Sequence, residues 1–69
     1  MTPKEKRIRM IIAVFIGKGY TVRELERRSE LAYATIWRLL HYFDTEPEKR
    51  HLPRKMTINI LERVLGLDK

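Results

Sequence analysis

The chain has 69 residues, no cysteine and two histidines, so it can form one small domain, residues 1–69, but neither disulfide bonds nor a good zinc site. Its 15 lysine and arginine residues against 9 acidic residues give a net charge of +6, which favours a polyanionic partner: nucleic acid first, an anionic membrane second. The longest apolar run, Met10 to Ile16, has seven residues, whereas a membrane-spanning helix needs about 20, so we expect a cytoplasmic protein.

The first predicted helix runs from its N-cap, Thr2, to about Ile16. Threonine, proline and glutamate at positions 2, 3 and 5 match a capping box with proline in the first turn. The residues that repeat at helical spacing form the predicted buried stripe: Ile8, Ile11, Ile12 and Phe15. Further apolar residues widen this surface: Met10, Val14 and Ile16. They indicate a second contact surface, and Gly17 and Gly19 are expected to end the helix.

The second and third predicted helices are separated by a short turn. Thr21 and Glu24 repeat the capping-box pattern, which predicts a helix continuing to about Ser29. After a turn over residues 29–32, a third helix is predicted from Tyr33 to Phe43. Its apolar residues share one face: Ile36, Leu39, Leu40 and Phe43.

The last third of the chain combines a loop with a fourth helix. Residues 44–53 contain two prolines and alternating charges, which are typical of a loop. An amphipathic helix is predicted from about Arg54 to Leu65 and ends at Gly66. Its buried residues are expected to be Ile58, Leu61, Val64 and Leu65. Because no strand pattern or repeat competes, the sequence predicts an all-α fold: a compact four-helix domain with a helix-turn-helix.

The outward face of the third predicted helix has an unusual composition. At 100° per residue, three residues lie opposite its buried face: Ala34, Arg38 and His41. Two aromatic residues, Tyr33 and Trp37, lie to one side, and there is no acidic residue on this face. Arginine can form two hydrogen bonds with guanine, while aromatic and methyl groups can contact thymine methyls and sugars. Two helices joined by a short turn can place such a face in the major groove of DNA.

Residues 21–39, TVRELERRSELAYATIWRL, resemble the helix-turn-helix of the lambda-repressor and Cro-like family. That family has a Glu-Leu-Ala helix, a Ser-Gly-Leu-Ser-like turn and a recognition helix containing Thr-Ile. Pro53, twelve residues before Leu65, is similar to the start of the family's fourth helix. The resemblance covers about fifty residues of the chain.

The chain departs from the family pattern at three positions. Glu26 replaces a small alanine where the helices cross, Glu30 replaces the turn glycine, and Ala32 replaces the serine that caps the recognition helix. A left-handed non-glycine residue and a missing cap each cost about 1 kcal/mol, so a locally rearranged turn is expected.

The resemblance implies a set of DNA-contacting residues. Base-reading positions fall on Tyr33, Ala34, Trp37 and Arg38. Positions that contact the DNA backbone fall on Thr21, Val22, Arg23, Thr35, Lys49, Arg50, Arg54 and Lys55. Backbone amides at a helix N-terminus bind phosphate, which supports the first of these positions independently. We expect a homodimeric, nucleoid-associated transcriptional repressor of double-stranded DNA, with no cofactor, metal or small-molecule effector.

Several alternatives stay open at the level of sequence. Trp37 could pack on the loop over residues 44–52, Tyr33 could pack on the second helix, and Arg38 could pair with Glu30 or Glu46. A winged helix-turn-helix would need a hairpin after the third helix. A small helical protein-interaction module of the antitoxin type is the alternative from another class. Catalysis is not expected, because the chain has no nucleophile beside a base and no glycine-rich phosphate loop.

Overall fold

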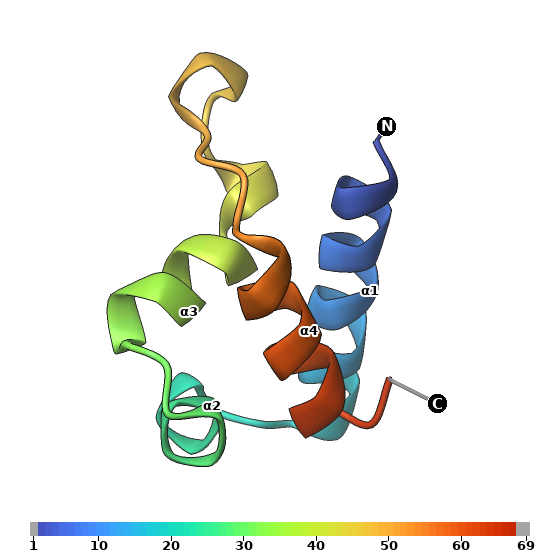
Figure 1. Ribbon diagram of the computed structural model, residues 1–69, viewed down its shortest axis with the longest axis vertical. Helices are drawn as coiled ribbons and strands as arrows, with labels where there is room; N and C mark the ends of the chain where they lie inside the picture. The colour runs from blue at the N-terminus through green and yellow to red at the C-terminus, as the bar shows by residue number, and fades with distance from the viewer. Residues whose placement is uncertain (1, 68–69) are drawn as a thin grey trace.

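The computed structural model describes residues 2–67, which form four α-helices, two single-turn 3-10 helices and no strand (Figure 1). The α-helices are α1 (Pro3–Lys18), α2 (Val22–Ser29), α3 (Tyr33–Leu40) and α4 (Lys55–Val64). The 3-10 helices are η1 (Tyr42–Asp44) and η2 (Pro47–Lys49). The all-α, four-helix fold is confirmed, while residues 1, 68 and 69 of the predicted domain lie outside the described part.

Two capping boxes begin α1 and α2, as predicted. The Thr2 hydroxyl accepts a hydrogen bond from the Glu5 backbone N–H at 3.2 Å, and the Glu5 carboxylate accepts one from the Thr2 N–H at 3.0 Å. Thr21 and Glu24 repeat this arrangement at 3.1 and 3.2 Å. Each box satisfies backbone donors that a helix start would otherwise leave unpaired.

α1 ends two residues later than predicted, because Gly17 lies inside the helix and Gly19 caps it in the left-handed conformation at φ 70°. Glycine within a helix costs about 1 kcal/mol relative to alanine. The next residue adds a contact at this end of the helix: the Lys18 ammonium donates a hydrogen bond to the Leu65 carbonyl at 3.1 Å. This contact joins the last turn of α1 to the end of α4.

α3 ends three residues earlier than predicted, at Leu40, and the chain tightens into η1. A 3-10 helix has 3.0 residues per turn rather than 3.6, so the side chains after Leu40 are rotated from their expected positions. Tyr42 is therefore buried, whereas Phe43, expected in the core, is only partly buried against it. The Tyr42 hydroxyl donates a hydrogen bond to the Glu5 carboxylate at 3.0 Å, which ties η1 to α1.

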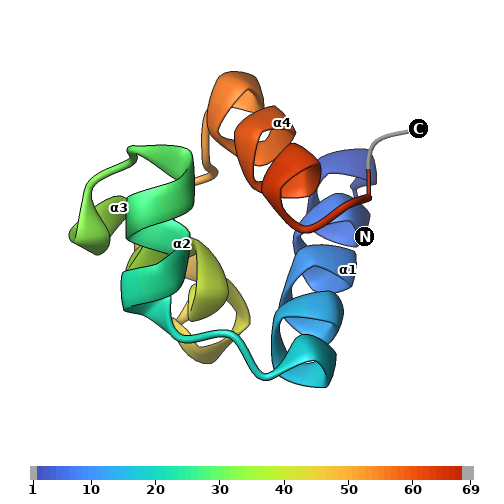
Figure 2. The ribbon, with the colours of Figure 1, turned by 90° about the horizontal axis from the view of Figure 1, so that it is seen from below.

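The four α-helices surround a single apolar core. Its buried members are Ile8, Ile11, Leu25, Ile36, Leu39, Leu40, Tyr42, Ile58, Leu61 and Leu65. Ile12, Phe15 and Val64, expected to be buried, pack against this core but remain partly exposed. Figures 1 and 2 both show α1 and α4 side by side, while α2 and α3 pack together opposite them; α2 contacts α4, and α3 contacts α1.

A partly buried ion pair links α1 to α4. Arg7 donates hydrogen bonds to both oxygens of the Glu62 carboxylate, at 2.9 and 2.6 Å, and a third to the Asn59 side chain at 2.6 Å. Hydrogen bonding from the Arg7 guanidinium holds the pKa of Glu62 below its ordinary value, because it stabilises the charged carboxylate. The pair therefore makes the stability of the domain depend on pH.

Replacing Glu62 with glutamine is expected to lower the free energy of unfolding by about 1 kcal/mol at pH 7. A carboxyl group with a lowered pKa in the folded state stabilises that state above its unfolded pKa, near 4.5, and loses this contribution as the pH falls through the folded value. The difference between wild type and variant should therefore shrink in acid. Urea unfolding followed by circular dichroism at pH 7 and pH 3 measures it. Glu48→Gln, on an exposed residue with no ion pair within residues 2–67, is the control; a pH-independent difference would contradict the assignment.

Candidate nucleic-acid interface

A three-residue turn, residues 30–32, joins α2 to α3 and sets the direction of α3. The Ser29 hydroxyl donates a hydrogen bond to the Leu25 carbonyl at 2.6 Å and accepts one from the Leu31 N–H at 3.2 Å. Glu30 has φ 61° and is the only non-glycine residue in the described range 2–67 with a positive φ. Ala32 caps α3 without a side-chain hydrogen bond. The turn therefore keeps a left-handed residue at Glu30 instead of avoiding that conformation.

Replacing Glu30 with glycine is expected to raise the free energy of unfolding by about 1 kcal/mol, because glycine removes the steric penalty of the left-handed conformation. Thermal and urea unfolding of the purified chain measure this gain. Glu46→Gly is the matched control, since Glu46 is also exposed but has φ −57°. Glycine there should only increase the entropy of the unfolded chain and lower stability. Equal losses in the two variants would contradict strain at Glu30.

The exposed side of α3 brings together the four residues expected to read bases. Tyr33, Ala34, Trp37 and Arg38 line one shallow depression on the surface. All four are exposed, including the two large aromatic residues: Tyr33 is 40% and Trp37 46% accessible to solvent. The helix buries Ile36, Leu39 and Leu40 on the opposite side. The sequence-based prediction of an exposed face with this composition is confirmed.

The neighbours of these residues resolve the alternatives left open by the sequence. The Arg23 guanidinium lies 4.9 Å from the centre of the Tyr33 ring, so Tyr33 does contact α2. Trp37 stacks on His41, with ring centres 4.1 Å apart, and remains 46% exposed. Arg38 forms no hydrogen bond or ion pair with any residue from 2 to 67, so the alternative bridges to Glu30 or Glu46 are absent there. Its five donors are available to a ligand.

The residues predicted to contact phosphate at the start of α2 and in α3 differ in how accessible their side chains are. The Thr21 hydroxyl is occupied in its capping box, and Val22 is partly buried against the core. The Arg23 side chain forms an ion pair with Glu26 at 3.4 Å but remains 80% exposed. In α3, Thr35 is partly buried and lines a cleft with Arg38. Arg23 is therefore the accessible cation of this group.

The basic residues in and after the loop before α4 are of two kinds: one is bonded within the loop and the others are exposed. Arg50 is used within the loop: its guanidinium donates hydrogen bonds to the carbonyls of Thr45 and Phe43, at 2.9 and 3.1 Å. Lys49 lies 3.7 Å from Glu46 but stays exposed. The side chains of Arg54 and Lys55 are exposed and make no hydrogen bond or ion pair with the described part of the chain. The geometry thus indicates that Arg50 stabilises the loop, which Figure 1 shows extending away from the helices.

A basic cleft that sequence reasoning missed lies between α3 and the segment before α4. It has a volume of about 420 Å³, and its lining includes Thr35, Arg38, His51 and Arg54. A smaller cleft beside it is also lined by Arg38 and His51. His51 is exposed and lines both clefts. No local sequence pattern could place it beside Arg38, because their proximity depends on the path of the intervening loop.

Other kinds of site find little support in the described residues. Among residues 2–67, no group of three or more histidine, aspartate or glutamate side chains is arranged to hold a metal ion. None of the helices in this range combines the length and apolar character needed to cross a bilayer. After α3 the chain forms η1 and η2 rather than the hairpin that a winged helix-turn-helix would need.

Comparison with known proteins gives no match among protein-family models, curated proteins or solved structures. The functional interpretation therefore depends on the residues and geometry of this chain.

Proposed function

We propose that this protein binds double-stranded DNA sequence-specifically, by inserting the exposed side of α3 into the major groove, and that it regulates transcription by occupying its site. The observation that carries the proposal is the position of Arg38 and its lack of a partner. Its guanidinium lies in the middle of the exposed face, has no partner within residues 2–67 and is flanked by an exposed tryptophan. A solvated helix surface usually carries acidic and basic residues that pair with one another.

The dimensions of α3 suit this role. An α-helix with its side chains is about 10–12 Å across and the major groove of B-DNA is about 12 Å wide, so the eight-residue α3 can lie in the groove. Arg38 would donate two hydrogen bonds to a guanine edge, and Ala34 would contact a thymine methyl group. Tyr33 and Trp37 would pack against sugars or thymine methyls at the sides of the groove. Specificity would come mainly from Arg38.

Exposed cations on both sides of α3 would hold the DNA backbone. Arg23 of α2 lies over the Tyr33 ring, and Arg54 lines a cleft with Arg38, so these two cations adjoin the α3 face from different elements; Lys55 follows Arg54 as the first residue of α4. Lys49 adds a further positive charge from η2. Such phosphate contacts fix the orientation of a protein on the duplex without reading its sequence. Their contribution falls with salt, because binding releases counterions from the DNA.

We expect Arg54→Gln and Lys55→Gln each to reduce the slope of log K against log salt by about 1. Fluorescence anisotropy with a labelled pool of random duplexes, at several salt concentrations, measures the slope. Lys6→Gln is the control for net charge, because Lys6 is an exposed residue of α1. An equal change in all three variants would place the DNA backbone on another surface. No binding of duplex DNA at low salt would overturn the proposed function.

A protein-interaction module is the second candidate, and one observation favours it. The surface carries an apolar groove beside α1 that is separate from the basic clefts. Enrichment of a defined sequence from a random duplex pool distinguishes the two functions, because an interaction module with a net charge of +6 would bind duplexes by charge alone and select no sequence.

A further inference from the structure

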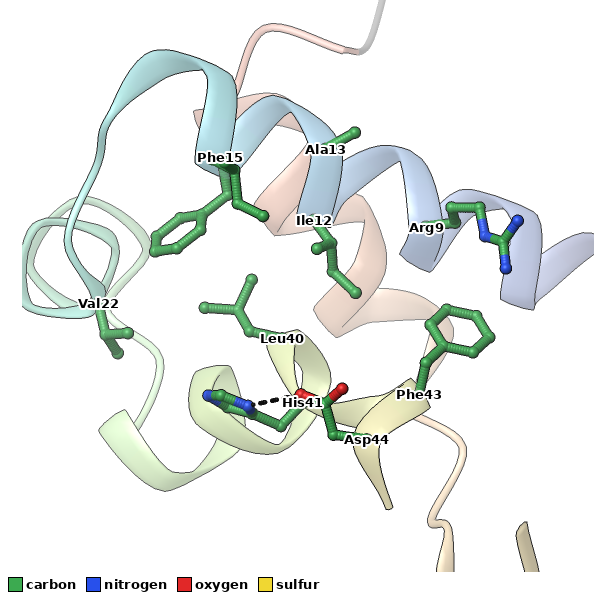
Figure 3. A pocket seen from close by; sticks show the side chains of 10 residues that line it. Arg9, Ile12, Ala13, Phe15, Val22, Leu40, His41, Phe43 and Asp44 are labelled. Carbon is green, nitrogen blue, oxygen red and sulfur yellow. Dashed lines mark hydrogen bonds and ion pairs between the residues drawn. The ribbon is translucent and has the colours of Figure 1, made fainter. Parts of the chain in front are cut away.

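An apolar groove of about 600 Å³ lies between α1, the start of α2 and the end of α3 (Figure 3). Its apolar lining includes Ile12, Phe15, Ile16, Val22, Leu40 and Phe43. Figure 3 shows charged groups at its edges, with Arg9 on α1 and Asp44 on η1. The groove is thus an apolar surface bordered by one cation and one anion.

α1 also carries exposed apolar residues beside this groove. Residues 10–17 contain no charged side chain, although 35% of the whole chain is charged. Ile16 is 69% and Met10 55% exposed, and Ala13 and Gly17 are exposed as well. Exposed apolar surface of this extent on a small domain usually marks an interaction site. One helix therefore supplies both a wall of the groove and residues that could fill one.

We infer that this surface binds a second copy of the same chain in a two-fold symmetric dimer. In such a contact, the same patch meets itself, so Ile16 of each copy would enter the groove of the other. Arg9 has no carboxylate partner within residues 2–67 and lies 5.4 Å from the centre of the Phe43 ring. The Asp44 side chain is 77% exposed; its Oδ2 lies 3.1 Å from His41 Nδ1, which leaves Oδ1 open to a further donor. A two-fold axis that sets one Arg9 opposite the Asp44 of the other copy necessarily repeats the contact, giving two ion pairs.

Charge favours a second copy over an acidic partner at this position. The net charge of +6 makes most surfaces of two copies repel each other, whereas the middle of α1 is uncharged. An acidic protein would be attracted to the basic residues around α3 rather than to the apolar groove. A stable dimer also needs to bury about 600 Å² per partner, roughly an eighth of the 5014 Å² surface. α1 has 16 residues and is about 24 Å long, so a dimer contact would have to run along its exposed side and into the groove to bury this area.

Only the role of the dimer rests on the proposed function: it would present two α3 faces to two half-sites on DNA. His41 lines the groove and stacks on Trp37, so the dimer surface adjoins the face expected to read bases. Each copy measures 30 × 25 × 22 Å. Two copies side by side therefore have centres roughly 22–30 Å apart, the same order as the roughly 34 Å between successive major-groove sites.

Sedimentation equilibrium of the DNA-free protein, from about 1 to 500 µM, tests this inference. Wild type is expected to sediment as a reversible dimer, and Ile16→Lys to raise the dissociation constant at least 100-fold. Met56→Lys is the matched control, because Met56 is 71% exposed on α4, away from the groove. Circular dichroism checks that both variants fold. A monomeric wild type, or equal weakening by both substitutions, would overturn the inference.

A charge exchange tests the symmetry of the contact independently. Arg9→Asp alone would bring acidic side chains together across the interface, and Asp44→Arg alone would bring basic ones together, so each should weaken self-association about 10-fold. An equimolar mixture of the two variants should recover heterodimers, because every introduced aspartate then faces an introduced arginine. A mixture no tighter than its components would exclude this pairing. Because no DNA is present, these results do not bear on α3, and a monomer that still binds duplex DNA would overturn the dimer alone.

Discussion

Replacing Ile36 with alanine is expected to lower the free energy of unfolding by about 3 kcal/mol. Ile36 is fully buried and lies at the centre of the α3 face that contacts the core. Alanine would remove apolar contacts and leave a cavity that the surrounding helices cannot fully close. In a domain this small, whose total stability is modest, such a loss should leave a large unfolded fraction near 37 °C.

Urea unfolding monitored by circular dichroism measures the effect of Ile36→Ala. Met56→Ala is the control, because Met56 is among the most exposed apolar residues of the described chain and should change stability by less than about 0.5 kcal/mol. A loss below 1 kcal/mol in Ile36→Ala would show that α3 is not packed against the core in the way described.

Replacing Arg38 with alanine is expected to weaken binding to the cognate duplex by about 1–3 kcal/mol and to change binding to scrambled DNA much less. The reason is that base contacts discriminate between sequences whereas phosphate contacts do not. Arg54→Ala is the matched control, since it removes the same charge from a position expected to contact phosphate. That variant should weaken both complexes alike.

Arg38→Lys separates geometry from charge at the same position. Lysine keeps the positive charge but cannot form the fork of two parallel hydrogen bonds that arginine makes. This variant should therefore lose most of the sequence preference while retaining much of the affinity for scrambled DNA. Titration of cognate and scrambled duplexes at one fixed salt concentration measures both effects. Equal proportional losses on the two duplexes would show that Arg38 does not read bases.

Helix starts could be predicted from sequence because capping is local. Thr2 with Glu5, and Thr21 with Glu24, satisfy one another over three residues, and no distant group is needed. The exposed face of α3 could be predicted for a similar reason, since helical periodicity alone separates Ile36 from the residues on the opposite side.

The end of α3 depended on contacts that periodicity does not contain. The apolar pattern continues to Phe43, but the chain tightens after Leu40 and buries Tyr42 instead. Tyr42 is fixed by Glu5, 37 positions away in sequence, and by the guanidinium of Arg50, 5.1 Å from its ring centre. A local sequence pattern carries no information about partners this far apart in the chain.

The candidate site likewise has a part that could be predicted from local spacing and a part that could not. Tyr33, Ala34, Trp37 and Arg38 share one helix, so their grouping follows from spacing. Arg50 and His51 belong to an irregular segment whose path is set by its own hydrogen bonds to backbone carbonyls. The sequence therefore could not indicate that the first stabilises the loop or that the second lines a cleft with Arg38.

The most direct test of DNA reading by α3 is selection of bound duplexes from a random pool, performed in parallel with wild type and Arg38→Ala. Wild type is expected to enrich a defined sequence containing a G·C pair that Arg38→Ala no longer selects, while the other preferred positions persist. Enrichment of no sequence by wild type, or of an identical sequence by both proteins, would contradict base reading by Arg38 on this face of α3.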